Sequence, residues 1–325
     1  MNRSAWKTTF AVAGPLLALG LGILAQVFAR HTIAFAPKAV ALLALSWALA
    51  AALGQWLPEP RPGGAPAVWR ARLRAAGGTI IVSLLRNVLF FLVPIWFASA
   101  TISSPNILAP IVLGATALLS CFPGLFRRRV LDRPRRRTLW CSAVLFAALV
   151  PAVAVETAAS PRVSAALAAA IAWVTASLTG SRRGLRGTVG RAELVSSAVV
   201  AALACALIAP ILPPVPVACS ARATGTGLRN RELEGIAARF PAGTRRVYAW
   251  FAVRLPPHYR QGIRLEWYRD GRPAGQVAAR EIVGGRAQGY RVSAFTASPG
   301  PGEWRVDLLT DASQLITRAH FQVAD

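Results

Sequence analysis

The sequence predicts two parts: an α-helical polytopic membrane bundle of about seven transmembrane helices over 1–218, and an all-β, immunoglobulin-like sandwich over 219–325. Three observations predict this fold class. Apolar residues make up 54% of the 325 residues and charged residues only 15%, whereas soluble domains carry about a quarter charged residues. Long uncharged stretches fill the chain up to about residue 220. Beyond that point, apolar and polar residues alternate as they do in strands.

Each expected membrane helix corresponds to an uncharged stretch long enough to cross a bilayer, which takes about 20 helical residues. The longest stretch has room for two helices, and Ser103-Ser104-Pro105-Asn106 near its middle is typical of a turn. The stretches are Thr8–Ala29, Ala39–Pro58, Asn87–Phe126 (two helices), Thr138–Val155, Val163–Ser181 and Leu194–Ala221.

The distribution of basic residues predicts the orientation, because short cytoplasmic loops are enriched in Lys and Arg. With the N-terminus inside, the inner segments 1–7, 58–86, 126–138 and 182–193 hold 18 basic residues, whereas the outer segments hold only Arg30, Lys38 and Arg162. We therefore expect a multi-pass protein of the bacterial inner (cytoplasmic) membrane, with a cytoplasmic N-terminus and a periplasmic C-terminal domain. The lipid bilayer is the expected partner of the basic loops.

Nucleic acid is not an expected partner, although the net charge is +24. The densest basic run, 127–137, lies between two expected membrane helices and has no aromatic residue on which a base could stack.

Arg86 and Asn87 are the polar pair nearest to an expected membrane helix, and two interpretations of them stay open. In one, Arg86 lies at the inner end of the helix and extends its guanidinium to the headgroups. In the other, Arg86 and Asn87 form a polar functional site inside the membrane, where charged residues are rare and usually functional.

The C-terminal part is expected to contain about seven short strands, which is the number and spacing of an immunoglobulin-like sandwich. In the clearest strand, Val247, Ala249, Phe251 and Val253 alternate with other residues, and Asp270-Gly271 predicts a tight hairpin. The expected strands are 221–228, 247–253, 263–268, 276–283, 290–298, 304–309 and 315–323.

Motifs of catalysis, cofactor binding or metal binding do not stand out, so we expect no enzyme activity, no cofactor and no metal. The three histidines lack metal-ligand neighbours, and the four cysteines form no C-x-x-C pattern. A phosphate-binding glycine loop is also missing. A membrane enzyme acting on lipid or lipid-linked sugar stays an alternative, for which Glu156 and Asp132 are the candidate groups of the membrane part.

Aromatic and basic residues of the C-terminal part are the candidates for partner binding. From Cys219 onwards the chain has 16 arginines and nine acidic residues, a net charge of 16 − 9 = +7, which favours an anionic ligand such as a cell-envelope protein or an anionic glycan. The candidate residues are Trp250, Trp267, Tyr268, Arg231 and Arg291. The alternative is that the aromatic residues form the core, because Trp267 lies on the apolar phase of its strand.

Several motifs of the C-terminal part occur together in a recognisable order. They are Ala223–Glu232 (ATGTGLRNRE), Val247–Phe251 (VYAWF), Leu265–Gly271 (LEWYRDG), Tyr290–Phe295 (YRVSAF), Gly302–Val306 (GEWRV) and the final Phe321-Gln322-Val323. With these motifs the segment resembles bacterial domain-of-unknown-function family 2914. One departure is Glu266, where the family pattern would have a histidine.

The membrane part looks like the companion domain-of-unknown-function family 5924, which often precedes that domain. The resemblance is carried by Val88–Thr101 (VLFFLVPIWFASAT), the basic break after Phe126, and Phe146–Pro151 (FAALVP). Arg86-Asn87 departs from the Gln-Glu pair that is usual there. Neither resemblance implies an activity or a catalytic residue.

The function expected from these observations is that of a non-enzymatic membrane protein, whose helices anchor a periplasmic β-sandwich that binds an envelope component or a protein partner. The alternative is a transporter or channel component with an accessory β-domain. It would need a polar cavity among the helices, for which the sequence offers few polar residues.

Overall fold

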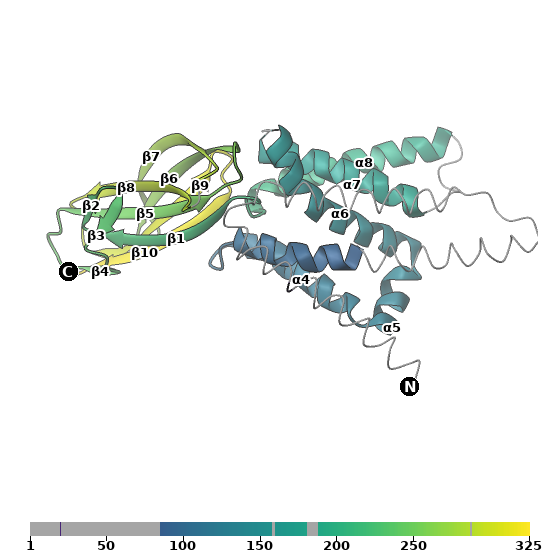
Figure 1. Ribbon diagram of the computed structural model, residues 1–325, viewed down its shortest axis with the longest axis horizontal. Helices are drawn as coiled ribbons and strands as arrows, with labels where there is room; N and C mark the ends of the chain where they lie inside the picture. The colour runs from purple at the N-terminus through teal and green to yellow at the C-terminus, as the bar shows by residue number, and fades with distance from the viewer. Residues whose placement is uncertain (1–19, 21–84, 158–159, 181–187, 287) are drawn as a thin grey trace, which may run out of the picture. The chain divides into compact units, whose positions relative to one another are not determined.

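The computed structural model describes residues 20, 85–157, 160–180, 188–286 and 288–325 (Figure 1). The chain forms two compact units. Among the described residues, the helical unit contains 85–94 and 111–208, and the β unit contains 95–110 and 209–325. The division does not follow the chain simply, because the segment 95–110 belongs to the β unit although it lies between helices.

The helical unit is built from a helix over Leu85–Ala98 and the elements that follow it. Pro123, Pro134 and Pro161 each occupy the first position of a helix, where a missing N–H costs nothing. The further elements are α4 (Leu108–Ser120), α5 (Pro123–Phe126), the π-helical turn η2 (Arg127–Leu131), α6 (Pro134–Thr157), α7 (Pro161–Gly180) and α8 (Thr188–Ile208).

Helix α7 packs between α6 and α8, and small residues make this close packing feasible. Buried alanines recur at three- and four-residue spacing along α7, at Ala165, Ala168, Ala169, Ala172 and Ala176. The indole Nε1 of Trp173 donates to the Ser197 hydroxyl of α8 at 2.9 Å. These contacts join the three helices into one bundle.

The expected bundle of seven transmembrane helices is wrong for the described residues. Among the residues that the structure describes, only Arg135–Thr157 and Ala192–Ile211 are long and apolar enough to cross a membrane. A third span exists if Pro105–Ser120 and Gly124–Leu131, which are bent by 106° to each other, count as one. The expected helices over 8–29 and 39–58 lie outside the described residues.

The error has a physical reason, since the length of an uncharged stretch sets only the upper limit of a helix. The stretch 87–126 breaks near Ser103–Asn106, as the sequence indicates, but the resulting pieces are short. Within the described residues, helix Leu85–Ala98 has fewer than the ~20 residues that a crossing needs, and α4 has 13. The residues between them belong to the β unit.

The all-β C-terminal region that the sequence predicts is confirmed. One sheet has the order β1-β5-β8, with β1 over Ala218–Gly225, β5 over Arg246–Arg254 and β8 over Tyr290–Ala297. The second has the order β4-β10-β9-β6-β7. Its strands are β4 (Arg239–Phe240), β10 (Leu315–Val323), β9 (Gly302–Thr310), β6 (Arg260–Arg269) and β7 (Arg272–Val283), and β2 (Gly227–Arg229) pairs with β3 (Glu232–Glu234) as a separate hairpin.

Alternation along the strands fixes the core of the β unit. Every second residue of β5, from Val247 to Val253, is fully buried. In the five-stranded sheet the ring of Phe321 stacks on Trp304 with 5.8 Å between centroids and meets Trp267 edge-on at 6.3 Å. The expected hairpin at Asp270-Gly271 is present, because both residues have positive φ and join β6 directly to β7.

The loop between helix Leu85–Ala98 and α4 is bonded to β10 within the β unit. The Asn106 side chain, 3% exposed, donates to the carbonyl of Leu315 at 2.9 Å and accepts from the Thr101 N–H at 2.9 Å. The Thr101 hydroxyl donates to the carbonyl of Ile316 at 3.1 Å. These bonds explain why the segment 95–110 groups with the strands rather than with the helices.

Candidate functional site

The structure distributes the seven candidate residues over four places. Trp267 lies in the core of the five-stranded sheet and is 3% exposed. Tyr268, the next residue of β6, lies on the outer face of the same sheet. Trp250, Arg231 and Arg291 come together at the three-stranded sheet, and Arg86 and Asn87 lie in the helical unit.

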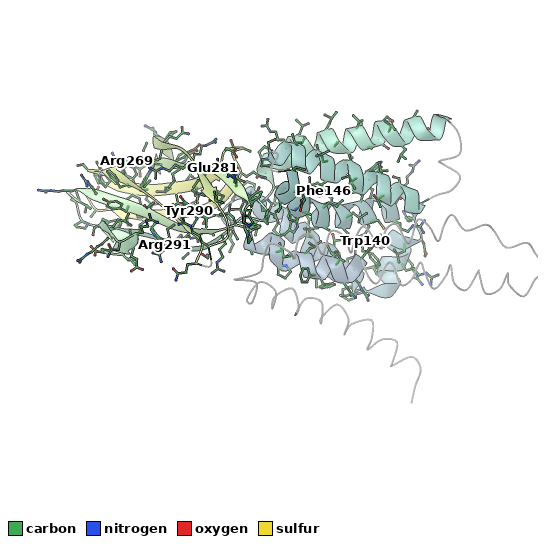
Figure 2. All side chains as sticks on the ribbon, turned by 45° about the horizontal axis from the view of Figure 1, so that its top comes forward. Trp140, Phe146, Arg269, Glu281, Tyr290 and Arg291 are labelled. Carbon is green, nitrogen blue, oxygen red and sulfur yellow. The ribbon has the colours of Figure 1, made fainter. Side chains whose placement is uncertain are left out.

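Trp250, Arg231 and Arg291 meet because the β2–β3 hairpin reaches the outer face of the three-stranded sheet. The hairpin turns at Asn230 and Arg231, which both have positive φ, as a two-residue turn requires. The indole Nε1 of Trp250 donates to the Arg231 carbonyl at 3.2 Å. Arg291 of β8, which Figure 2 labels, forms an ion pair of 3.7 Å with Glu232, the first residue of β3.

More aromatic residues and another arginine continue this face. Tyr248 of β5 lies opposite Phe295 of β8, with 5.3 Å between ring centroids. The guanidinium of Arg246 lies over the Phe295 ring at 5.1 Å, and Phe295 remains 47% exposed. We call the set Arg246, Tyr248, Trp250, Arg291 and Phe295 the aromatic face.

The residues of the aromatic face that the sequence analysis missed are Arg246, Tyr248 and Phe295. A signal for them was available, because Val247, Ala249 and Phe251 define the buried phase of β5 and so place Arg246, Tyr248 and Trp250 on the other side. Phe295 follows only from the register of β8 against β5, which the sequence does not show.

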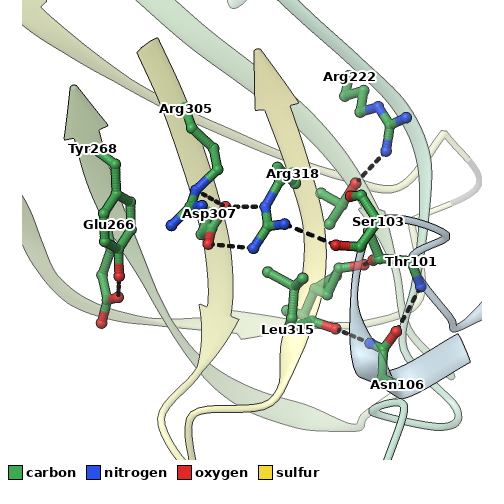
Figure 3. A network of polar contacts seen from close by, with 12 residues as sticks. Thr101, Ser103, Asn106, Arg222, Glu266, Tyr268, Arg305, Asp307, Leu315 and Arg318 are labelled. Atoms are coloured by element: carbon green, nitrogen blue, oxygen red, sulfur yellow. Dashed lines mark hydrogen bonds and ion pairs between the residues drawn. The ribbon is translucent and has the colours of Figure 1, made fainter. Parts of the chain in front are cut away.

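Tyr268 belongs to a different arrangement, a network of charges across the outer face of the five-stranded sheet (Figure 3). Its hydroxyl donates to Glu266 at 2.7 Å, and Glu266 pairs with Arg264 at 3.0 Å. This hydrogen bond to Glu266, followed by burial, raises the pKa of Tyr268. Arg305 of β9 lies over the Tyr268 ring at 4.1 Å.

Asp307 is the centre of this network and is 5% exposed. Arg318 of β10 donates to both of its carboxylate oxygens, at 2.6 and 2.9 Å, and Arg305 forms an ion pair with it at 3.4 Å. The bidentate hydrogen bond to Asp307 raises the pKa of Arg318. Arg318 also donates to the Ser103 carbonyl at 2.9 Å, so the network extends to the loop at 101–106. We call Arg264, Glu266, Tyr268, Arg305, Asp307 and Arg318 the charge network.

The two arrangements differ in what they leave for a ligand. In the charge network the carboxylates and guanidinium groups bond to each other, and their strongest contacts are buried or half-buried. On the aromatic face the one ion pair among the described residues is long and involves Glu232, which is 75% exposed, and the short hydrogen bond of Arg291, 2.8 Å, goes to the neutral side chain of Gln288. Cations beside exposed aromatic rings can contact an anionic partner, so the aromatic face is the candidate binding surface.

In the helical unit, Arg86 and Asn87 are adjacent polar residues with incomplete hydrogen bonding. One terminal nitrogen of Arg86 is 3.5 Å from the Ser120 carbonyl. Arg86 Nε and Asn87 Oδ1 are buried and have no hydrogen-bond partner among the residues that the structure describes. Among all the residues that the structure describes, no three His, Cys, Asp or Glu side chains lie close enough together to hold a metal ion.

Residues 260–323 match the family described as Protein of unknown function (DUF2914). The match includes all of β6 to β10, and therefore the charge network, whereas β1 and β5 lie outside it. The resemblance of the helical part to family 5924 is not shown. No curated protein matches the chain.

Proposed function

We propose that this chain is a non-enzymatic binding protein of the bacterial inner membrane. Its helices anchor a β unit that faces the periplasm and binds an anionic component of the cell envelope. Two apolar helices of crossing length, Arg135–Thr157 and Ala192–Ile211, support the membrane anchor. The arginines of 182–191 directly before the second of them support a cytoplasmic start for that helix, and the β unit that follows it would then face the periplasm. We further propose that the helical part corresponds to the companion family 5924.

The aromatic face carries the binding part of this proposal. Tyr248, Trp250 and Phe295 present ring surface on one side of a sheet, and Arg246 and Arg291 add two cations there. Aromatic residues and arginine are the types most enriched in protein interfaces. The β unit as a whole has an excess of arginine, which favours an anionic partner by electrostatic complementarity.

A photocrosslinking experiment in living cells tests this proposal. A photoreactive amino acid replaces Ser293, which lies beside Trp250 on the aromatic face, in the full-length protein. We expect a crosslinked envelope component of defined mass, which disappears when Arg291 is also changed to Glu. The matched control places the same probe at Gln322, an exposed residue of β10 in the other sheet. A product that forms equally from Gln322, or none from Ser293, contradicts the proposal.

A component of a transporter or channel is the second candidate function, and one observation favours it. Arg86 Nε and Asn87 Oδ1 are buried polar atoms without a described hydrogen-bond partner, and such atoms usually meet water, an ion or a substrate. The test is solute or ion flux into vesicles that contain the full-length protein. Flux that Arg86→Leu abolishes and Arg127→Leu leaves unchanged would favour this candidate over a simple anchor.

A further inference from the structure

Strand β8 is an edge strand, because it pairs only with β5 in the order β1-β5-β8 (Figure 1). The N–H of Ser298 donates to the Arg245 carbonyl, and the register continues without a shift from Ala297 to Tyr290. Hydrogen-bonded and non-hydrogen-bonded pairs alternate in an antiparallel ladder. The N–H and C=O groups of every second residue therefore point away from β5, and these residues are Arg291, Ser293, Phe295 and Ala297.

The outward backbone groups of these four residues have no hydrogen-bond partner within 85–157, 160–180, 188–286 or 288–325. Such a row of donors and acceptors is a template for another strand. Proteins normally protect an edge of this kind with proline, charge, a bulge or a very short strand. The other edges of the β unit show what that protection looks like here.

Each of the other edges carries at least one such protection. Strand β7 contains Pro273 and several charged residues, and its pairing with β6 shifts register twice. Strand β1 has a register shift between Cys219 and Ala221, and β10 lies beside it. Strand β4 has only two residues. Strand β8 has eight residues without proline or register shift, and Arg291 is its single charged residue.

The charges around β8 are mainly positive. Arg291 lies on the strand itself, Arg246 lies over Phe295, and Arg286 lies over the ring of Tyr290 at 4.6 Å. Pairing of two β8 strands from two copies of the chain would bring these arginines together and is therefore disfavoured. An acidic strand would instead meet complementary charge.

From this edge and its charge we infer that β8 accepts an extended acidic segment of a partner polypeptide as an added strand. The inference rests on the proposed function and names the class of partner and its mode of binding. Backbone hydrogen bonds to the four outward residues supply affinity, and side chains at alternate positions supply specificity. A polypeptide is favoured over a glycan, because a glycan has no regular row of amides to match the free N–H and C=O groups.

The spacing along β8 also defines the sequence that the added strand should have. Arg291 and Phe295 lie on the same face of β8 and are separated by three residues. A partner strand should therefore place an acidic residue beside Arg291 and an apolar residue beside Phe295, with three residues between them. On β5, Tyr248 pairs with Phe295 and Trp250 pairs with Ser293, so both rings extend the contact surface.

The first test measures binding of synthetic octapeptides to the full-length protein in lipid nanodiscs. The probe alternates threonine and valine and carries one glutamate at the position that should face Arg291. One control has lysine in place of glutamate. Two further peptides carry N-methyl groups on alternate amides, in the two possible phases: one peptide on the odd-numbered residues and the other on the even-numbered residues, so that only one of them blocks the amides that face β8. We expect the lysine peptide to bind at least about tenfold more weakly, and only one N-methylated phase to lose binding.

The second test uses variants of β8 with matched controls. Ser293→Pro removes an N–H that points away from β5, so the ladder within the sheet stays intact. Ser293→Ala keeps this N–H and serves as its control. We expect Ser293→Pro to bind about tenfold more weakly than Ser293→Ala, which keeps the backbone donor. Arg291→Glu should weaken binding similarly, whereas Arg272→Glu on β7 should not. Circular dichroism and the tryptic pattern verify that each variant is folded.

The possible outcomes separate this inference from the proposed function. Binding that both N-methylated phases retain, or that Arg272→Glu reduces equally, overturns strand addition. A crosslink at Ser293 in cells would leave the proposed function standing in that case. A dimer of the full chain that Ser293→Pro dissociates, without peptide binding, would show self-pairing and also overturn the inference. Failure of both the crosslink and the peptides contradicts both.

Discussion

The two sheets of the β unit carry arginine on their outer faces, but they use it differently. On the five-stranded sheet, Arg318 and Arg305 surround the buried carboxylate of Asp307, and Arg264 pairs with Glu266. On the three-stranded sheet, Arg246 lies over an exposed phenylalanine, and Arg291 donates to the neutral Gln288 side chain at 2.8 Å and forms a long ion pair of 3.7 Å with an exposed carboxylate. Guanidinium groups that are paired with carboxylates stabilise the fold, whereas those beside exposed rings remain accessible to a partner.

The largest expected effect comes from breaking the charge network at its centre. Asp307→Asn removes the charge that two guanidinium groups share, and leaves two half-buried cations without their counter-ion. We expect a loss of about 3 kcal/mol in the free energy of local opening, because breaking a buried ion pair strands its partners. Hydrogen exchange of the β9 and β10 amides in the full-length protein measures this loss. Glu303→Gln changes the charge equally at an exposed position of β9, and an equal loss in that variant would contradict the interpretation.

A smaller effect is expected at the loop that Arg318 contacts. Asn106→Ala leaves the Leu315 carbonyl and the Thr101 N–H without the bonds that the amide side chain provides. Unpaired buried groups of this kind should destabilise the loop by about 2 kcal/mol. The readout is hydrogen exchange over residues 99–107 together with β10. Ser104→Ala provides the comparison, since its hydroxyl makes only a long contact of 3.4 Å with the Asn106 N–H. Protection in β10 that is unchanged by Asn106→Ala would show that the loop does not stabilise the strand.

The sequence was sufficient to predict those features that depend on local pattern. Period-two alternation identified the buried phase of β5 and β6, and Asp270-Gly271 identified the hairpin between β6 and β7. The same alternation placed Trp267 on the apolar phase, which is the core position that the structure shows. Local pattern works here because side chains of a strand alternate strictly between two faces.

Contacts between distant parts of the chain were beyond the sequence. Thr101 and Asn106 bond to residues more than 200 positions later, so the uncharged stretch 87–126 could not reveal that its middle belongs to the β unit. The prediction of seven membrane helices failed for the described residues because uncharged length was taken as helix length. The face that unites Trp250, Arg231 and Arg291 depends on where the β2–β3 hairpin lies, and no local pattern specifies that.

Burial and the positive charge beside the charge network should both be visible in the titration of His320. Burial, and then the charge of Arg318, lower the pKa of His320, with smaller contributions from Arg305 and Arg222 and an opposing one from Asp307. As the pH falls, the unfolded chain therefore takes up this proton at about the ordinary pKa of 6.5, before folded His320 does. Stability should fall as the pH falls below that value.

The thermal midpoint of the full-length protein at about pH 7.5 and about pH 5.5 measures this effect. His320→Gln should reduce the dependence on pH, because it removes the titrating group. A thermal midpoint of the unchanged protein that rises on acidification, and a variant that does not alter that slope, would together contradict a lowered pKa.

The smallest expected effect on stability is on the aromatic face. Arg246→Ala removes a cation that lies over Phe295 but forms no ion pair with a described carboxylate. We expect the free energy of opening of β5 and β8 to change by no more than about 0.5 kcal/mol, as is usual for exposed positions. Hydrogen exchange of the two strands measures it, and Arg318→Ala on the charge network should cost several times more because Asp307 loses its bidentate partner. Equal costs in the two variants would mean that both faces are structural, and that the arginines of the three-stranded sheet are not held available for a partner.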